Sequence, residues 1–195
     1  MEASGGSPKQ LTHGPADNVI PSWSRDGSSI YFASKRSGRF EISRIPAHGG
    51  TAQQITRNGG YVAFDSADGK TLYYTLTHAG AEGLYAKPLP NGEERQLLKD
   101  EIAGRGFAVF SDGVYYLYSR DGHRPPEDTS MAPFQNSAEG YDIRFYNFDS
   151  GRSKILGGIE GALHNGLAVS PDQKTFLFTK IIDSGSDLML IENFR

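Results

Sequence analysis

A short turn signature recurs along the chain and constrains its fold more strongly than any other feature. Copies or close variants of Ser-x-Asp-Gly stand at residues 24–27, 66–69, 111–113 and 170–173, each just before an apolar run. The Asp carboxylate of such a turn accepts backbone N–H groups, and Gly adopts the positive φ that the turn requires. We therefore interpret these Asp residues as turn formers between paired strands rather than as metal ligands or acid–base groups.

The fourth turn differs from the others, because Gln173 stands in the last position of the signature. A residue with a Cβ atom in the left-handed backbone region costs roughly 1 kcal/mol. The sequence therefore predicts a strained residue at this turn.

The spacing of the turns predicts the fold class. Asp26, Asp68 and Asp112 lie 42 and 44 residues apart, and Asp172 follows after another 60. A period of about 40–45 residues is typical of the four-stranded blade of a β-propeller, and the longer last interval indicates an insertion in the third unit. The sequence therefore predicts an all-β protein, a β-propeller of four-stranded antiparallel blades with four repeats in this chain.

Four short runs of the first unit are expected to form one blade, from the innermost strand to the outermost. They are residues 19–24, 29–34, 40–45 and 52–56. The runs are too short for helices, and their Tyr, Phe, Ile and Val content favours strands. We expect a single propeller domain over residues 1–195, with blades at approximately 16–58, 59–100, 104–158 and 162–195 plus 7–13.

The second strand of a unit is apolar on both faces. In the first unit, Ile30 and Phe32 alternate with Tyr31 and Ala33. A sheet with one face in water would alternate apolar with polar residues, whereas stacked blades bury both faces of their middle strands. We therefore expect these aromatic residues to form the core between blades rather than a platform for a ligand.

The fourth unit supplies three strands, which we expect near residues 166–170, 175–180 and 187–194. Its outermost strand is missing. Residues 8–13, by contrast, have the pattern of an outermost strand without a unit of their own.

These two observations predict how the propeller closes. We expect Gln10, Leu11 and Thr12 to pair with the strand that contains residues 188–191, which would complete the last blade and remove an exposed strand edge. The alternative is an open arc of four blades, which pairs with a second copy or forms part of a larger ring. A closed ring predicts a monomer, and an open arc predicts a homodimer.

The composition argues against several classes of partner. The 195 residues carry a formal net charge of -3, whereas nucleic-acid binding needs clustered Lys and Arg to displace counterions from phosphates. The absence of Cys excludes disulfides and thiolate metal sites. No run approaches the roughly 18 consecutive apolar residues of a membrane span. We therefore expect neither a nucleic-acid partner nor a membrane partner.

Three motifs of the first unit follow one another, Pro-Ser-Trp-Ser-Arg-Asp-Gly at 21–27, Ile-Tyr-Phe at 30–32 and Gln-Ile-Thr at 54–56. Together they resemble the repeat of TolB-type propellers, a group of WD40-like (PD40) β-propellers. The end of the chain, residues 186–195, is similar to the end of propellers in multidomain bacterial regulators. The resemblance implies a module of a larger bacterial protein and suggests the periplasm, although the Gly/Ser-rich start lacks the apolar region of a signal peptide.

Residues just before the inner strands of a propeller converge near its axis, so they are candidates for a ligand site at the channel mouth. In this chain they are Asp17, Asn18, Asn58, Arg105, His164 and Asn165. Arg is a bidentate partner for an anion, His titrates near neutrality, and Asn donates and accepts hydrogen bonds. The competing interpretation is that these residues only cap and solvate the ends of loops.

The insertion of the third unit spans residues 120–140 and contains three Pro. Most such segments are surface loops, but long loops also form partner sites. Met131 and Phe134 are the residues we expect to contact a partner.

Several enzyme classes lack their signatures. The chain has no Gly-x-Ser-x-Gly elbow, and its five His residues are scattered without the spacing of a zinc site. We therefore expect no catalytic residues, metal or cofactor, and a non-catalytic module for protein–protein interaction or small-ligand sensing. The alternative is a carbohydrate-active enzyme: a glycosidase, for which Asp17 and Asp65 are the available carboxylates, or a polysaccharide lyase in which Arg105 neutralises charge and His164 is the base.

Overall fold

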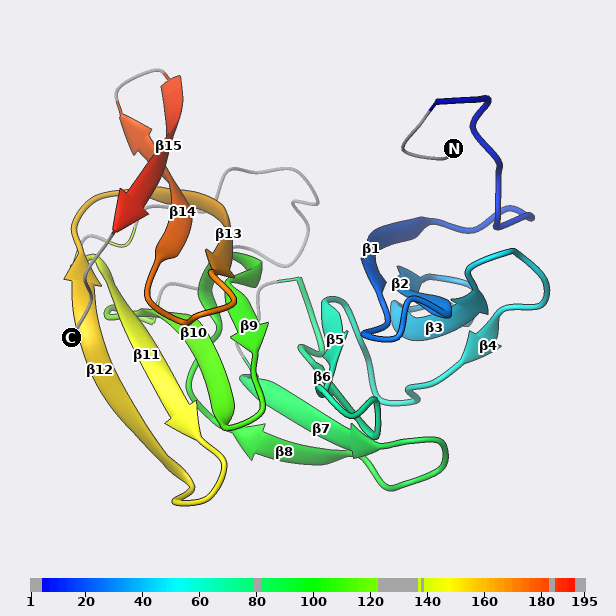
Figure 1. Cartoon of the computed structure of the whole chain (residues 1–195), viewed down its shortest axis with the longest axis horizontal. Helices are drawn as coiled ribbons and strands as arrows, with labels where there is room; N and C mark the ends of the chain where they lie inside the picture. Colours follow the sequence, from blue (N-terminus) through cyan, green and yellow to red (C-terminus); the bar gives the residue numbers. More distant parts are fainter. Residues whose placement is uncertain (1–4, 79–81, 123–136, 138, 183–184, 192–195) are drawn as a thin grey trace.

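The computed structural model describes residues 5–78, 82–122, 137, 139–182 and 185–191. Its described strands form four antiparallel sheets, and within each sheet the strands follow their order along the chain (Figure 1). The all-β prediction of four-stranded antiparallel blades is thereby confirmed for the first three sheets, while the fourth sheet has three strands.

The first two sheets contain eight short strands. The first sheet consists of β1 (Asn18–Trp23), β2 (Ser29–Ser34), β3 (Glu41–Pro46) and β4 (Gln53–Gln54). The second consists of β5 (Ala63–Asp65), β6 (Thr71–Tyr74), β7 (Leu84–Pro88) and β8 (Arg95–Leu98). Each sheet is thus one blade, with its innermost strand first.

Apart from β9, the strands of the last two sheets are longer than those of the first two. A 3-10 turn, η1 (Ala103–Arg105), leads into the third sheet. That sheet consists of β9 (Phe107–Val109), β10 (Gly113–Ser119), β11 (Tyr141–Asn147) and β12 (Arg152–Ile159). The fourth consists of β13 (Leu163–Val169), β14 (Phe176–Ile182) and β15 (Gly185–Ile191).

The first, second and fourth of the repeated turns have the Asp chemistry that the sequence predicts. In the first, Ser24 Oγ donates to Asp26 Oδ1 at 2.6 Å, the backbone N–H of Ser28 donates to the same oxygen at 2.9 Å, and Gly27 has φ 69°. The hydrogen bonds from Ser24 and Ser28 lower the pKa of Asp26 to about 2. The carboxylates of Asp26, Asp68 and Asp172 are therefore occupied by local donors and serve their turns.

The fourth turn shows how its unusual residue is tolerated. Gln173 has φ 59°, in the left-handed region that the sequence predicts. Its Oε1 accepts a hydrogen bond of 2.8 Å from the hydroxyl of Tyr115, which lies in β10 of the third blade. The side chain that strains the turn therefore also links two blades.

The hydrophobic core lies between the blades, as expected from the two-sided apolar strands. Tyr31, Tyr74 and Tyr116, one from the second strand of each of the first three blades, are all at most 2% exposed. They belong to one core that joins these three sheets, and a second core joins the third sheet to the fourth. The aromatic stripe is thus a packing feature.

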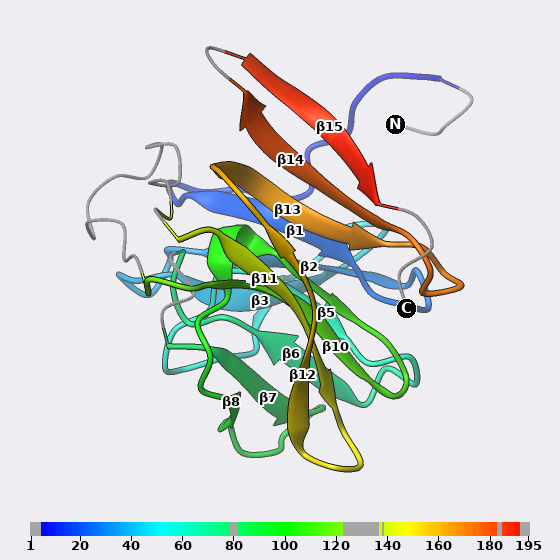
Figure 2. The same cartoon turned by 90° about the vertical axis from the view of Figure 1, so that its left-hand side faces the viewer.

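The four sheets follow one another around the molecule, from β1–β4 through β5–β8 and β9–β12 to β13–β15 (Figure 1). Their inner strands are neighbours, since β1 contacts β5, β5 contacts β9 and β9 contacts β13. Figure 2 shows the fourth sheet at one end of this series, with β15 at its outer edge.

The predicted closure by the N-terminal segment is not found. Residues 6–13 form no strand, and the sheet of β13, β14 and β15 has no fourth strand among the described residues. Instead Lys9 Nζ donates to the carbonyl of His48 at 2.6 Å, and Arg36 donates to the carbonyl of His13 at 3.0 Å. The segment therefore lies on the first blade, because turns of that blade satisfy its polar groups.

Within the part of the chain that the structure describes, no helix has the length and apolar character needed to cross a membrane.

Candidate functional site

Arg105 combines three unusual features at the point where the chain enters the third blade. It ends η1 with φ 61°, a backbone conformation that costs a non-glycine residue about 1–2 kcal/mol. Its Nε is buried without a hydrogen-bond partner among the described residues. Its guanidinium carbon lies 5.4 Å from the centre of the Tyr61 ring, a cation–π distance. The structure thus holds this side chain in a defined place at a cost in strain and desolvation.

Arg105 is one end of a row of aromatic and basic side chains, which we call the aromatic–basic cluster. It consists of Lys35, Phe40, Tyr61, His78 and Arg105. The Tyr61 ring meets Phe40 edge-on at 5.1 Å and His78 at 5.2 Å, and Lys35 Nζ lies 5.8 Å from the centre of the Phe40 ring. The cluster therefore spans loops of the first three blades, at the end where the inner strands begin.

A pair of glycines lets Tyr61 reach this position. The connection from β4 to β5 passes so close to β3 that a Cβ atom at Gly60 would lie 2.6 Å from Ile42 Cγ1 and 2.8 Å from Thr56 Oγ1. Gly59 has φ 108°, which L residues rarely adopt. The local sequence thus brings the connection, and the tyrosine that follows it, against the first blade.

The electrostatics of the cluster are those of two cations beside a neutral imidazole. Burial, and then the charge of Arg105, lower the pKa of His78 below its usual value of 6.5. His78 is therefore uncharged at neutral pH, and the basic side chains of the cluster are Lys35 and Arg105. Such a surface offers a guanidinium to a carboxylate and aromatic rings to the apolar part of the same ligand.

Two of the other residues predicted for the channel mouth lie at the same end of the blades. Asp17 is exposed, and its carbonyl accepts a hydrogen bond of 3.0 Å from the backbone N–H of Lys35. Asn18 Nδ2 donates to the carbonyl of Ala16, while its Oδ1 is buried without a partner among the described residues. Ser34 is paired with Asn18 across β1 and β2, and its hydroxyl is also buried without a partner among the described residues.

Asn58 lies elsewhere. Its Nδ2 donates to Glu94 Oε2 at 2.9 Å, and the backbone N–H of Arg57 donates to the other oxygen of Glu94 at 2.8 Å. Glu94 directly precedes β8, the outermost strand of the second blade. Asn58 therefore links the outer parts of two blades and is not brought to the aromatic–basic cluster.

His164 and Asn165 lie in β13, and this strand packs against η1, the turn that ends at Arg105. Their side chains lie outside the described part of the structure, as do Met131 and Phe134 of the insertion.

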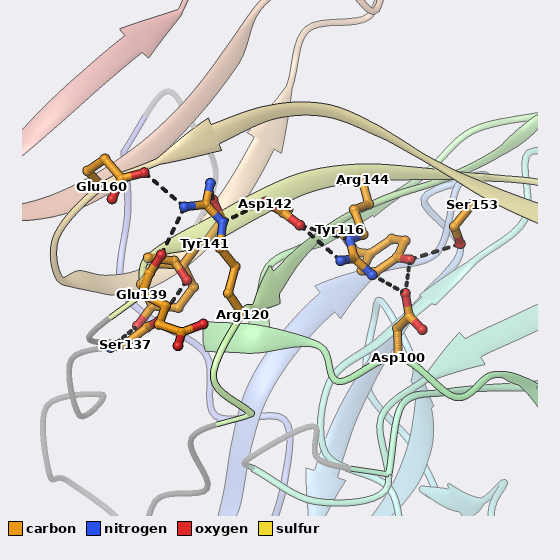
Figure 3. A network of polar contacts seen from close by, with 11 residues as sticks. Asp100, Tyr116, Arg120, Ser137, Glu139, Tyr141, Asp142, Arg144, Ser153 and Glu160 are labelled. Carbon is orange, nitrogen blue, oxygen red and sulfur yellow. Dashed lines mark hydrogen bonds and ion pairs between the residues drawn. The ribbon is translucent and has the colours of Figure 1, made fainter.

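A second polar assembly lies in the third blade and was not anticipated from the sequence (Figure 3). Asp142 accepts hydrogen bonds from Arg120 Nε at 2.8 Å and from Arg144 Nη2 at 2.9 Å. Arg120 also reaches Glu160 at 2.8 Å, and Arg144 reaches Asp100 at 2.8 Å. Asp142 thus lies between two guanidiniums, each of which has a further carboxylate.

This network holds together the two ends of the insertion. The backbone N–H of Arg120 donates to the carbonyl of Gly140 at 3.2 Å, and Arg120 Nη1 donates to the carbonyl of Glu139 at 2.8 Å. Ser137 Oγ donates to the carbonyl of Gly140 at 2.7 Å. Because its charged groups are engaged with one another, we assign the network a structural role at the neck of the insertion.

Sequence reasoning singled out Arg105 but missed Phe40, Tyr61 and His78. The available signal was an aromatic residue directly after the Gly59–Gly60 pair, in a connection that leads to an inner strand. Among the described residues, no group of three or more His, Asp or Glu side chains is arranged to hold a metal ion.

The geometry defines a repeat protein of propeller blades that carries an aromatic–basic cluster on its loops. A family model described as the TolB beta propeller domain matches residues 1–126, so the chain belongs to this family. This confirms the resemblance seen in the first unit.

The chain is also similar to individual proteins. It is 39% identical over 56 residues to an uncharacterized protein of Agrobacterium fabrum, Atu1656, which covers 29% of this chain and 19% of that protein. TolB from Acinetobacter baumannii is 20% identical over 89% of this chain and 40% of its own, with a TM-score of 0.65. An oligogalacturonate lyase from Vibrio parahaemolyticus is 17% identical over 92% of this chain and 54% of its own, with a TM-score of 0.64.

At these identities the solved structures show the fold alone. The chain spans less than a fifth of the curated relative and between two fifths and roughly half of these two solved structures.

Proposed function

We propose that this chain is a non-catalytic binding module, which recognises a carboxylate of a protein partner or of a small ligand through its aromatic–basic cluster. The observation that carries the proposal is the state of Arg105. Its left-handed backbone and its buried, unpartnered Nε are both unfavourable in the described structure. Strain of this kind is characteristic of ligand sites, where it fixes a side chain before binding.

The energetic argument favours a charged oxygen ligand. A buried donor without a partner costs about 1–3 kcal/mol, and a hydrogen bond to a charged group contributes about 1.5–3 kcal/mol. A carboxylate that contacts the Arg105 guanidinium would therefore bind more tightly, because this group is already oriented and partly desolvated. Lys35 adds a second positive charge at the other end of the cluster.

The remaining cluster residues suit the non-ionic part of such a ligand. Tyr61 is buried, so it supports Arg105 rather than contacting solvent, whereas Phe40 and His78 are only half-buried. A neutral His78 adds no positive charge of its own beside Arg105. The expected ligand thus has a carboxylate with an adjoining planar or sugar-like surface.

Isothermal titration calorimetry with galacturonate and with a short Glu-rich peptide tests the proposal. We expect at least one of them to bind, and Arg105→Gln to weaken this binding about 10- to 100-fold because a charged hydrogen bond is lost. Arg152→Gln is the matched control, since Arg152 is an exposed arginine of β12. Equal binding by Arg105→Gln and Arg152→Gln would contradict the proposal.

One observation favours an enzyme as a second candidate. Arg105 and an uncharged His78 flank the same tyrosine ring. In a lyase reaction on a uronate, Arg105 would neutralise the carboxylate while His78 takes the proton on the carbon next to it. The carbon–oxygen bond of the leaving sugar then breaks as the new double bond forms, and the departing sugar oxygen takes up a proton from water. The fold similarity to an oligogalacturonate lyase makes this substrate worth testing.

The test of this second candidate is the ultraviolet absorbance of the unsaturated product after incubation with oligogalacturonate. Turnover that His78→Gln abolishes would favour the enzyme, and binding without turnover would favour the binding module.

A further inference from the structure

The first blade carries a polar depression of about 420 Å³ that is separate from the Arg105 side chain. It is lined by Ser37, Gly38, Arg39, Glu41, Gln54 and Arg57. These residues come from the β2–β3 turn, the start of β3, β4 and the connection that follows it.

Glu41 forms the buried floor of this depression and has its oxygens fully engaged. The residue is 2% exposed, and it accepts hydrogen bonds from Arg39 Nε at 2.6 Å, Thr56 Oγ1 at 2.7 Å and the Gly59 N–H at 3.0 Å. The Glu41 carboxylate therefore points inward and orients Arg39, and it does not offer negative charge to a ligand.

The outward-facing charge of the depression is positive. Arg39 donates through Nη2 to the carbonyl of Arg57, which leaves its Nη1 without a partner among the described residues. Within the same part of the chain, the exposed guanidinium of Arg57 has no hydrogen-bond or ion-pair partner. Arg39 and Arg57 carry two formal positive charges and Glu41 one negative charge, so the lining is positive although the chain as a whole carries a formal net charge of -3.

We propose that this depression is an oxyanion site for a small ligand with two or more negative charges, held through its oxygens by Arg39 and Arg57. Guanidinium groups bind both carboxylate and phosphate oxygens in bidentate fashion, so a polycarboxylate and a phosphorylated compound share the required chemistry. Gln54 adds a side-chain oxygen beside the site, because its Nε2 already donates to the carbonyl of Thr56. That oxygen would accept a hydrogen bond from a ligand hydroxyl.

The site is independent of the function proposed for Arg105, because none of its lining residues belongs to the aromatic–basic cluster. Loss of one site should therefore leave the other intact.

Isothermal titration calorimetry at low ionic strength, with citrate in one arm and inorganic phosphate in the other, tests this site in the whole chain. We expect at least one anion to bind and Arg57→Gln to weaken it about 10-fold or more. Preference for citrate would assign a polycarboxylate, and preference for phosphate would assign a phosphorylated ligand. Arg57 is exposed, so its replacement does not threaten folding.

Two controls separate this site from general charge and from Arg105. Arg152→Gln removes one exposed positive charge elsewhere, and Arg105→Gln removes the other proposed anion site; both should bind within about 2-fold of wild type. Failure of both anions to bind, or an equal loss in Arg57→Gln and Arg152→Gln, would overturn the proposal. A loss in Arg105→Gln alone would assign the anion to the aromatic–basic cluster and would likewise refute this site.

Discussion

Arg25 of the first blade donates its backbone N–H to both carboxylate oxygens of Asp65 in the second blade, at 3.1 and 3.2 Å. The Nη2 of Arg25 donates to the carbonyl of Val109 in the third blade at 2.5 Å. One residue of the β1–β2 turn thus joins three blades at the ends of their inner strands. These polar contacts hold neighbouring sheets in a fixed relative position. They act in addition to the apolar core that is packed between the sheets.

Replacement of Asp65 should weaken the joint between the first two blades. Asp65 is 3% exposed, so Asp65→Ala leaves the Arg25 N–H without its acceptor, and we expect the free energy of unfolding to fall by about 1–3 kcal/mol. Asp112→Ala, at an exposed turn carboxylate, is the control and should cost less than about 0.5 kcal/mol. Urea denaturation measures both, and similar losses in the two variants would argue against an interblade role for Asp65.

Asp65 should also give the protein a recognisable pH dependence. Burial raises the pKa of this carboxyl above 3.8, although the Arg25 N–H opposes the shift. The folded state therefore holds the Asp65 proton more tightly than the unfolded state does. As pH rises from 3.8 through the folded pKa, this group lowers the free energy of unfolding.

Asp65→Asn removes that contribution. The free energy of unfolding of the variant relative to wild type should therefore increase as pH rises through this window. This holds even if the substitution itself changes stability by a constant amount. Urea denaturation at several pH values from acid to neutral measures the difference, and a difference that is constant or falls with pH would contradict the assignment.

The network at the neck of the insertion predicts unequal roles for its carboxylates. The Asp142 side chain is 9% exposed and that of Glu160 is 77% exposed, although both pair with Arg120. Asp142→Asn should cost about 2–3 kcal/mol because two guanidiniums lose a buried partner, whereas Glu160→Gln should cost less than about 0.5 kcal/mol. Thermal or urea unfolding distinguishes them.

The pH dependence of Asp142 has the opposite sign to that of Asp65. Burial alone would raise the pKa of Asp142, but hydrogen bonds from Arg120 and Arg144 hold it below 3.8. Its contribution to stability is therefore present above pH 3.8 and is lost as pH falls through the folded pKa. Asp142→Asn should lie closest to wild type in acid, and a gap that widens in acid would count against this network.

Gln173 and Tyr115 should be energetically coupled. In wild type, Gln173→Gly relieves a positive φ but removes the acceptor of the Tyr115 hydroxyl, so the net change should lie near zero. In a Tyr115→Phe background the hydrogen bond is already absent, and Gln173→Gly should stabilise by about 0.5–1 kcal/mol. A double-mutant cycle of urea denaturation measures the coupling, and identical effects in both backgrounds would rule it out.

Much of the fold was predictable because its determinants are local. Asp26, Asp68 and Asp172 each accept a backbone N–H from two residues further on, and Gly27 and Gly69 supply positive φ, so the period of the blades is visible in the sequence. The two-sided apolar pattern of the second strands likewise predicted burial between blades.

The partner of the N-terminal segment was not predictable in the same way. Its pattern suits an outermost strand, but no sequence rule states which polar groups lie nearest in three dimensions. In the structure, the carbonyl of His48 and the guanidinium of Arg36 are the groups that engage it. Asn58 was misplaced for a similar reason, since the acceptor that holds it, Glu94, lies 36 residues away.

The sequence by itself determined the class of fold and the position of Arg105 before an inner strand, because both depend on spacing and turn chemistry. Only the tertiary structure decided the surroundings of that arginine. Tyr61 reaches it from the second blade and carries His78 of the same blade against its ring, and the left-handed backbone and buried Nε depend on how the blades pack. Contacts between distant segments are set by the packing of the whole chain, and a single sequence does not display them.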